Sequence, residues 1–202
     1  MSPRVTIEWS MKQIVEWPIP KNKRLQPTTH PISNLQQQRV RWQCPSAGTL
    51  KMNVDAAVTE GQQHFSVGLV LRDHQGQFII GKTRKFAGSV QVVEAETIAI
   101  LEALSWLEDL QVSTGVIKSD SLLSVIAINR RYHNYLELGS WVHHCKSIIH
   151  RRVGYSVVHV RKQANKVAHQ MAKIPCKLNS FVIMSSPPLS LLETLLSDAS
   201  LN

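Results

Sequence analysis

The spacing of apolar and polar residues along the chain predicts strands first and then alternating helices and strands. Residues 50–58 alternate between apolar and polar positions, which is typical of a half-buried strand. Residues 65–86 hold two apolar runs on either side of the turn "DHQGQ", whose glycine suits the positive φ of a hairpin. This part of the chain therefore predicts three antiparallel strands.

The second half of the pattern is mostly helical. Residues 92–110 have the helical period, and Ala95, Ala99 and Ala103 form a stripe of small residues that would let the helix lie close to a sheet. The elements expected after it are a strand at 115–121, helices at 121–130 and 138–151, a strand at 154–160 and a helix at 165–173. This order predicts an α/β fold with a five-stranded mixed sheet flanked by helices.

Three regions follow from these boundaries. Residues 1–48 carry seven basic and two acidic residues, a net charge of +5, and form a basic N-terminal arm that either holds nucleic acid or is a solvated tail. Residues 49–175 form the domain. Residues 176–202 form a C-terminal tail in which Pro187 and Pro188 start a short helix that we expect to dock on the domain.

Composition limits the class of protein. The chain has 202 residues, of which 43% are apolar and 18% charged, and its net charge of +9 favours polyanionic partners. The three cysteines have no paired spacing and predict reduced thiols in an intracellular protein, nuclear or cytoplasmic. No apolar run approaches the length of a secretory signal or a membrane span, so we expect neither, and we expect a monomer.

Three acidic residues stand out because the chain has only fourteen. Asp55 lies within the first apolar strand, Glu96 near the start of the alanine-striped helix and Asp120 at the end of a short strand. Carboxylates among apolar residues are costly unless they are paired or bind a metal. Strand ends and helix starts of this kind meet at one edge of a sheet, so we expect the three carboxylates within about 4–8 Å of one another, holding Mg²⁺ or Mn²⁺.

The motifs together resemble a known family. The segments "LKMNVDAAV", "VGLVLRDHQGQFIIG", "VEAETIAILEAL", "VIKSDS" and "HVRKQANKVAHQMAK" are similar, in order and spacing, to the type-I ribonuclease H domain. Within it, "WQCPSAGTLKMNVDAA" stands where the plant-type, reverse-transcriptase-like branch derived from non-LTR retroelements has "W-x-P-P-x-x-G-x-x-K-x-N-x-D-G-A". The resemblance covers about residues 42–173, and the tail also looks like that branch.

The resemblance implies a two-metal nuclease that uses four acids in the order Asp, Glu, Asp, Asp. Asp55, Glu96 and Asp120 match the first three, and His169 stands in the fourth position. His159, ten residues before His169, matches the family's mobile histidine, which assists proton transfer or product release. The histidine at the fourth position either changes the metal preference of the site or marks a class that no longer cleaves.

Two of the acid assignments have alternatives. Glu94 lies close to Glu96, but Glu96 shares the helix face of Ala99 and Ala103 and has the family spacing. Asp120 could cap the helix that follows it, a role that is compatible with metal binding. Ala56 replaces the usual glycine after the first acid and reduces backbone freedom there.

The family's substrate is the RNA–DNA hybrid, which is read by 2′-hydroxyl contacts. Val92 and Val93 stand where many members have polar residues for this purpose, so we expect weak discrimination between the hybrid and structured RNA. Arg161, Lys162, Asn165 and Lys166 are candidates for contacts with nucleic acid, and Asn165 is also a candidate helix N-cap.

Two interpretations remain after these observations. The first is a metal-dependent endonuclease that cleaves the RNA strand of RNA–DNA hybrids, and the three acids and His159 favour it. The second is a non-catalytic nucleic-acid-binding or assembly module, a domesticated ribonuclease H fragment, and His169, Ala56 and the two valines favour it. A retroelement remnant with no selected role is a third.

Overall fold

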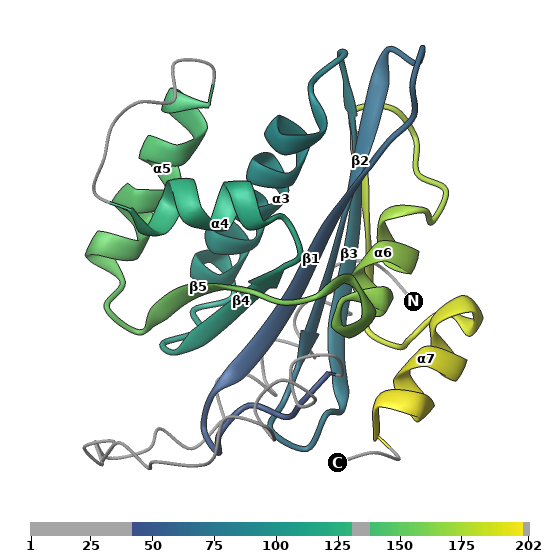
Figure 1. Ribbon diagram of the computed structural model, residues 1–202. Coiled ribbons are helices and arrows are strands. Elements are labelled where there is room, and N and C mark those ends of the chain that lie inside the picture. The colour runs from purple at the N-terminus through teal and green to yellow at the C-terminus, as the bar shows by residue number, and fades with distance from the viewer. Residues whose placement is uncertain (1–41, 131–137, 200–202) are drawn as a thin grey trace.

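A computed structural model describes residues 42–130 and 138–199, which form one mixed sheet with helices on both faces (Figure 1). The sheet has the order β5-β4-β1-β2-β3-β6. The strands β4 and β5 run parallel to β1, and β2, β3 and β6 pair antiparallel. The strands are β1 (Leu50–Val58), β2 (His64–Arg72), β3 (Phe78–Ala87), β4 (Gly115–Ser119), β5 (Tyr155–His159) and β6 (Ser180–Met184).

The helices divide between the two faces of the sheet. Figure 1 shows α3, α4 and α5 on one side and α6 and α7 on the other. Their bounds are α3 (Val92–Asp109), α4 (Leu122–Asn129), α5 (Gly139–Arg151), α6 (Lys166–Ala172) and α7 (Leu189–Ala199), with a 3-10 turn, η1 (Lys162–Ala164), before α6. None of the helices within the described residues has the length and apolar character needed to cross a bilayer.

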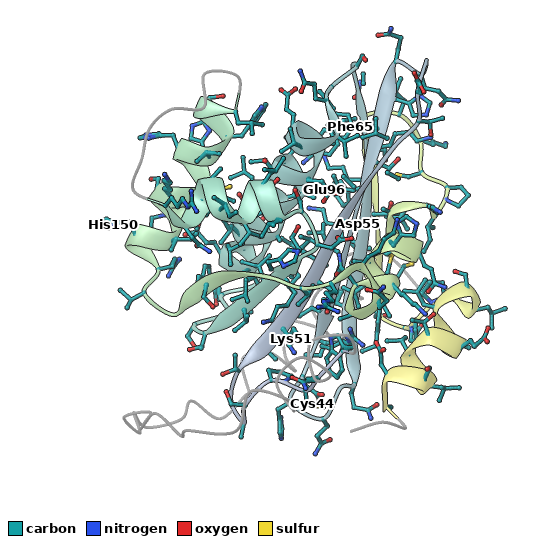
Figure 2. All side chains as sticks on the ribbon, viewed as in Figure 1. Cys44, Lys51, Asp55, Phe65, Glu96 and His150 are labelled. Atoms are coloured by element: carbon teal, nitrogen blue, oxygen red, sulfur yellow. The ribbon has the colours of Figure 1, made fainter. Side chains whose placement is uncertain are left out.

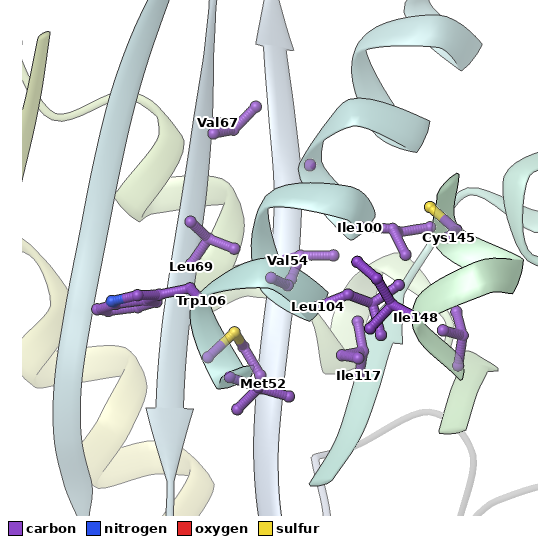
Figure 3. Close-up of a cluster of buried hydrophobic side chains, with 14 of the residues drawn as sticks. Met52, Val54, Val67, Leu69, Ile100, Leu104, Trp106, Ile117, Cys145 and Ile148 are labelled. Carbon is purple, nitrogen blue, oxygen red and sulfur yellow. The ribbon is translucent and has the colours of Figure 1, made fainter. Parts of the chain in front are cut away.

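The main core lies between the sheet and α3 (Figure 3). Met52 and Val54 of β1 and Leu69 of β2 point to this side, because side chains alternate between the two faces of a strand. Ala95, Ala99 and Ala103 are fully buried, as the stripe of small residues predicts. This packing confirms the α/β fold with a mixed sheet.

On the opposite face α6 lies directly on β2 at Gly68. A Cβ atom at this glycine would come within 2.1 Å of the Ala172 backbone nitrogen and 2.7 Å of the Ala168 carbonyl oxygen. Both are backbone atoms, so the helix could not move aside cheaply. Gly68 pairs in register with Asp55 on the neighbouring strand. The close contact therefore brings the middle of α6, where His169 stands, beside Asp55.

The tail differs from the sequence prediction in one feature. The sheet has six strands instead of five, because residues 180–184 of the tail pair with β3 as β6. The short tail helix is present as α7, and its Leu191 is buried against α6 and β2 in a second small core. Alternation is weak in "SFVIM", so the sequence pattern gives little signal for an edge strand there.

Trp42, assigned to the arm from the sequence, is 4% exposed and packs on the domain. Its ring lies under the Arg72 guanidinium, 3.7 Å from the ring centre, and under the Lys51 ammonium at 4.7 Å. The hairpin turn at Gly76 also approaches this ring. The rest of the predicted arm, residues 1–41, lies outside the described residues.

We expect Gly68→Ala to destabilise the protein by about 3 kcal/mol or more, because the added methyl group overlaps backbone atoms of α6. Thermal unfolding followed by circular dichroism measures the change. Gly139→Ala is the matched control, since a Cβ atom there meets nothing within 4 Å, and it should leave the stability unchanged or slightly raised. Equal effects of the two substitutions would contradict the close packing of α6.

Candidate active site

The three acids identified from the sequence converge at one place. Asp55 comes from β1, Glu96 from the first turns of α3 and Asp120 directly follows β4. One carboxylate oxygen from each lies within 4.8 Å of the other two, and Figure 2 shows Asp55 and Glu96 facing the same region. The expected clustering of these carboxylates is confirmed.

Burial and mutual repulsion make the ionised cluster unfavourable without a cation. Burial, followed by the charges of Asp55 and Asp120, raises the pKa of Glu96 to about 9, against the opposing backbone hydrogen bond of Ala56 and the charge of Lys162. Burial and then the charge of Asp120 raise the pKa of Asp55 to about 6, against the hydrogen bond with His169. Both shifts have the same physical origin, a concentration of negative charge away from water.

An oxygen-ligated divalent cation fits this cluster. The Oε2 atom of Glu96 is buried and has no hydrogen-bond partner within the described residues. All three groups offer carboxylate oxygens, the ligands that Mg²⁺ and Mn²⁺ prefer. A bound dication would compensate the charge that raises the two pKa values and would give the Glu96 oxygen a partner.

Glu96, and not Glu94, belongs to the cluster. Glu96 is 8% exposed and lies with Asp55 and Asp120. Glu94 is only half-buried, and its carboxylate accepts a hydrogen bond from the indole of Trp141 at 3.2 Å. Side chains two positions apart on a helix point to different faces, so Glu94 and Glu96 contact different groups.

His169 lies against the first acid. Its ring Nδ1 is 2.8 Å from Asp55 Oδ2, and its side chain is about one third exposed. With Asp55 ionised, an Nδ1–H tautomer of His169 can donate to this carboxylate. The ring therefore occupies one oxygen of Asp55.

Asn165 holds Asp120 in place. Its amide nitrogen donates to Asp120 Oδ1 at 2.7 Å and to the Val54 carbonyl at 2.8 Å, and its amide oxygen accepts from Asn53 Nδ2 at 2.8 Å. Asn165 stands at the N-cap position of α6, as predicted, but makes no side-chain capping bond because these partners use its amide. It is 1% exposed, so the predicted contact with nucleic acid does not fit its position.

The same network continues to the C-terminal helix. Asn53 Oδ1 accepts from the Trp42 indole at 2.9 Å and from Arg72 Nη2 at 3.0 Å. Arg72 Nη1 donates to Asp198 Oδ2 of α7 at 2.7 Å. A chain of hydrogen bonds thus runs from α7 through a buried guanidinium and two amides to Asp120. The sequence analysis missed Asn53 and Arg72; the available signal was that Asn53 shares the strand face of Asp55 two residues later.

Asp120 does not cap the helix that follows it. Ser121 is the N-cap of α4, and its hydroxyl accepts from the Ser124 backbone nitrogen at 3.4 Å. The Asp120 carboxylate instead accepts from Asn165. Capping by the neighbouring serine leaves this carboxylate available to the cluster.

His159 ends β5, where the register pairs it with Ser119, the residue before Asp120. It therefore lies at the same sheet edge as the acids, half-buried beside a pocket. Arg161, Lys162 and Lys166 are exposed nearby, as expected for residues that could contact phosphates. Their roles and that of His159 remain predictions.

The sequence profile of the reverse transcriptase-like family matches residues 53–174, more than half of the chain. The chain belongs to the reverse transcriptase-like family. This confirms the family seen in the sequence motifs, while the plant-type branch remains a prediction. The match begins at Asn53 and ends just after α6, so it includes all five candidate catalytic residues. No curated protein sequence matches the chain.

Solved structures agree with the fold of this family member. RNase H1 from the halophilic archaeon Halobacterium salinarum NRC-1 is 20% identical with a TM-score of 0.56, and the match covers 61% of this chain and 94% of that one. LC11-RNase H1 in complex with an RNA/DNA hybrid is 19% identical with a TM-score of 0.54, covering 60% and 92%. LC9-RNase H1, described as a type 1 RNase H with the type 2 active-site motif, is 10% identical with a TM-score of 0.56, covering 75% and 84%.

We expect Glu96→Gln to stabilise the metal-free protein by about 1–3 kcal/mol at pH 7–8. Glu96 keeps its proton up to about pH 9 in the folded protein but only to about 4.5 when unperturbed. Between these values the folded state binds more protons than the unfolded state, so the free energy of unfolding falls as pH rises. Thermal unfolding in EDTA from pH 5 to 9 measures the slope, which the substitution should flatten.

Glu102→Gln is the matched control for this effect. Glu102 pairs with Lys82 at 3.3 Å and Arg84 at 2.7 Å, so its neutralisation should lower the stability. Addition of Mn²⁺ or Mg²⁺ should raise the melting temperature of the wild type and have less effect on Glu96→Gln. Destabilisation by Glu96→Gln in EDTA would show that the cluster is not under electrostatic strain.

We expect Asn165→Ala to destabilise the protein by about 2–4 kcal/mol, because it leaves buried partners at Asp120, Val54 and Asn53 unsatisfied. Asn129→Ala removes a single bond to the Val157 carbonyl and should cost about 1 kcal/mol. Denaturant titration of both variants provides the comparison. Similar losses would mean that the amide network contributes little to stability.

Proposed function

We propose that the protein is a metal-dependent endonuclease that cleaves the RNA strand of RNA–DNA hybrids. The convergence of Asp55, Glu96 and Asp120 within 4.8 Å on a ribonuclease H fold carries this proposal. The structure of LC11-RNase H1 in complex with an RNA/DNA hybrid supports the substrate class. Mg²⁺ or Mn²⁺ is the proposed cofactor, since such an ion lowers the pKa of bound water and stabilises charge on phosphate oxygens.

The residues of the chain have separate tasks in this proposal. Asp55, Glu96 and Asp120 hold the metal, and Asn165 orients Asp120. His169 orients Asp55 through Nδ1, and its Nε2 can accept or donate a proton near the scissile phosphate. His159, at the same sheet edge, can assist proton transfer or product release.

The contact between His169 and Asp55 favours a second candidate, a non-catalytic nucleic-acid-binding module. If two ions bound here, both would need Asp55 as a ligand. Here the imidazole takes one oxygen of Asp55, and the position carries no fourth negative charge. Binding of a second ion should therefore be weak.

If the site is catalytic, Mn²⁺ should support more activity than Mg²⁺, because Mn²⁺ accepts an imidazole ligand better.

We expect the wild type to cleave a labelled hybrid weakly with Mg²⁺ and faster with Mn²⁺. His169→Asp should raise the Mg²⁺-supported rate about tenfold by restoring charge at the second ion position. His169→Ala should reduce the rate less than Asp55→Asn or Asp120→Asn, which should abolish cleavage. Rates at fixed salt, with circular dichroism to confirm folding, provide the test.

The decisive outcome concerns the wild type and His169→Asp together. If both bind hybrid but fail to cleave it with either metal, the catalytic proposal is wrong and the binding module is correct.

The side chain of the exposed Val92 at the start of α3 offers no hydrogen bond to a 2′-hydroxyl. We therefore expect hybrid and duplex RNA to bind with similar affinity, measurable in the same preparations.

A further inference from the structure

A pocket of about 550 Å³ opens beside the acid cluster on the face of the sheet that α6 covers only in part. Its lining includes Lys51 and Asn53 of β1, Lys118 of β4, His159 at the end of β5 and Arg161 two residues later, with Trp42 at one side. Every second side chain of a strand points to the same face, so Lys51, Asn53 and Asp55 of β1 share this face. Figure 2 shows Lys51 on the same strand as Asp55, further toward the strand's N-terminus.

The lining of this pocket is cationic. Lys51, Lys118 and Arg161 face it, and none of the described residues that line it is acidic. Lys51 is only 7% exposed, and its ammonium donates to the Gln43 carbonyl and lies over the Trp42 ring. Burial, followed by the charges of Lys118 and Arg72, lowers the pKa of Lys51 to about 7. Such an arrangement of like charges is more stable when an anion lies among them.

The donor groups and their location fit a phosphate. Two ammonium groups and one guanidinium offer charged hydrogen bonds to phosphate oxygens. The pocket includes His159, whose register partner Ser119 precedes Asp120, so it is next to the acid cluster along one sheet edge. A nucleic-acid strand crossing the cluster would pass its mouth.

We propose that this pocket binds a phosphate group of the nucleic-acid strand that lies across the acid cluster. The proposal rests on nucleic acid as the substrate, as proposed above, but not on cleavage. It assigns Lys51, Lys118 and Arg161 to the interface, of which only Arg161 is apparent from the basic stretch around α6. Lys118 is the informative residue to change, because it is half-buried at the pocket and no hydrogen bond of its ammonium is seen within the described residues.

The test measures binding of a fluorescent RNA–DNA hybrid by anisotropy in EDTA across a range of KCl concentrations. Each phosphate contact contributes about 0.9 to the slope of log affinity against log salt. Lys118→Gln should reduce that slope by about 0.9 and weaken binding several-fold. Lys118→Arg should restore both. Lys177→Gln, an equal charge change at an exposed position near β6, should leave both unchanged.

A second measurement uses inorganic phosphate as the probe. At constant ionic strength, phosphate should raise the melting temperature of the wild type and of Lys177→Gln, but not of Lys118→Gln. Phosphate stabilisation combined with an unchanged salt slope in Lys118→Gln would overturn the assignment to a strand phosphate, leaving a small-anion site only. The proposal is also wrong if Lys118→Gln and Lys177→Gln give the same slope of log affinity against log salt, or if the hybrid does not bind.

Failure of this proposal is separable from failure of the proposed function. EDTA removes the metal, so the binding assay does not depend on cleavage. A protein that shows the Lys118 effect but never cleaves supports the pocket and contradicts the nuclease. A protein that cleaves hybrid while Lys118→Gln keeps the wild-type slope supports the nuclease and contradicts the pocket.

Discussion

The contact of α6 with β2 at Gly68 is the constraint on which the arrangement of the site depends. Because Gly68 has no side chain, the backbone of α6 lies directly against β2. Gly68 is also the cross-strand partner of Asp55 on β1, so the helix lies close to this acid. Two side chains reach the site as a result: His169 contacts Asp55, and Asn165 contacts Asp120. The helix has only seven residues, so tertiary packing and not intrinsic helix stability holds it there.

Polar groups on the α6 face form a continuous network instead of an apolar layer. The Arg72 guanidinium is buried, yet it has Asn53, Asp198 and the Trp42 ring as partners. Buried polar groups of this kind are stable when they are hydrogen-bonded and costly when one partner is removed. The network connects α7 and Trp42, which lie outside the residues matched by the family profile, with the carboxylate of Asp120.

Charge is distributed unevenly along β1, and two positions on one face of this strand suit ligands of opposite sign. At Asp55, three buried carboxylates favour a cation. At Lys51, four residues earlier, a pocket lined by basic side chains favours an anion. In the proposed complex, one nucleic-acid strand with its divalent ions would carry both kinds of charge and contact both positions.

The sequence by itself determined the order of strands and helices, the family and the three acids, because these depend on local periodicity and on motif spacing. It also distinguished Glu96 from Glu94, since helix geometry places them on different faces. Only the tertiary structure decided that Asn165 supports Asp120 instead of meeting nucleic acid, that Ser121 caps α4, and that residues 180–184 add a sixth strand. It also decided that Trp42 is buried and that Lys51 and Lys118 share a pocket. Apart from the local Ser121 cap, each of these depends on which distant segments come into contact, and hydrophobic periodicity carries no information about polar partners such as Asn53 and Asn165, which are 112 residues apart.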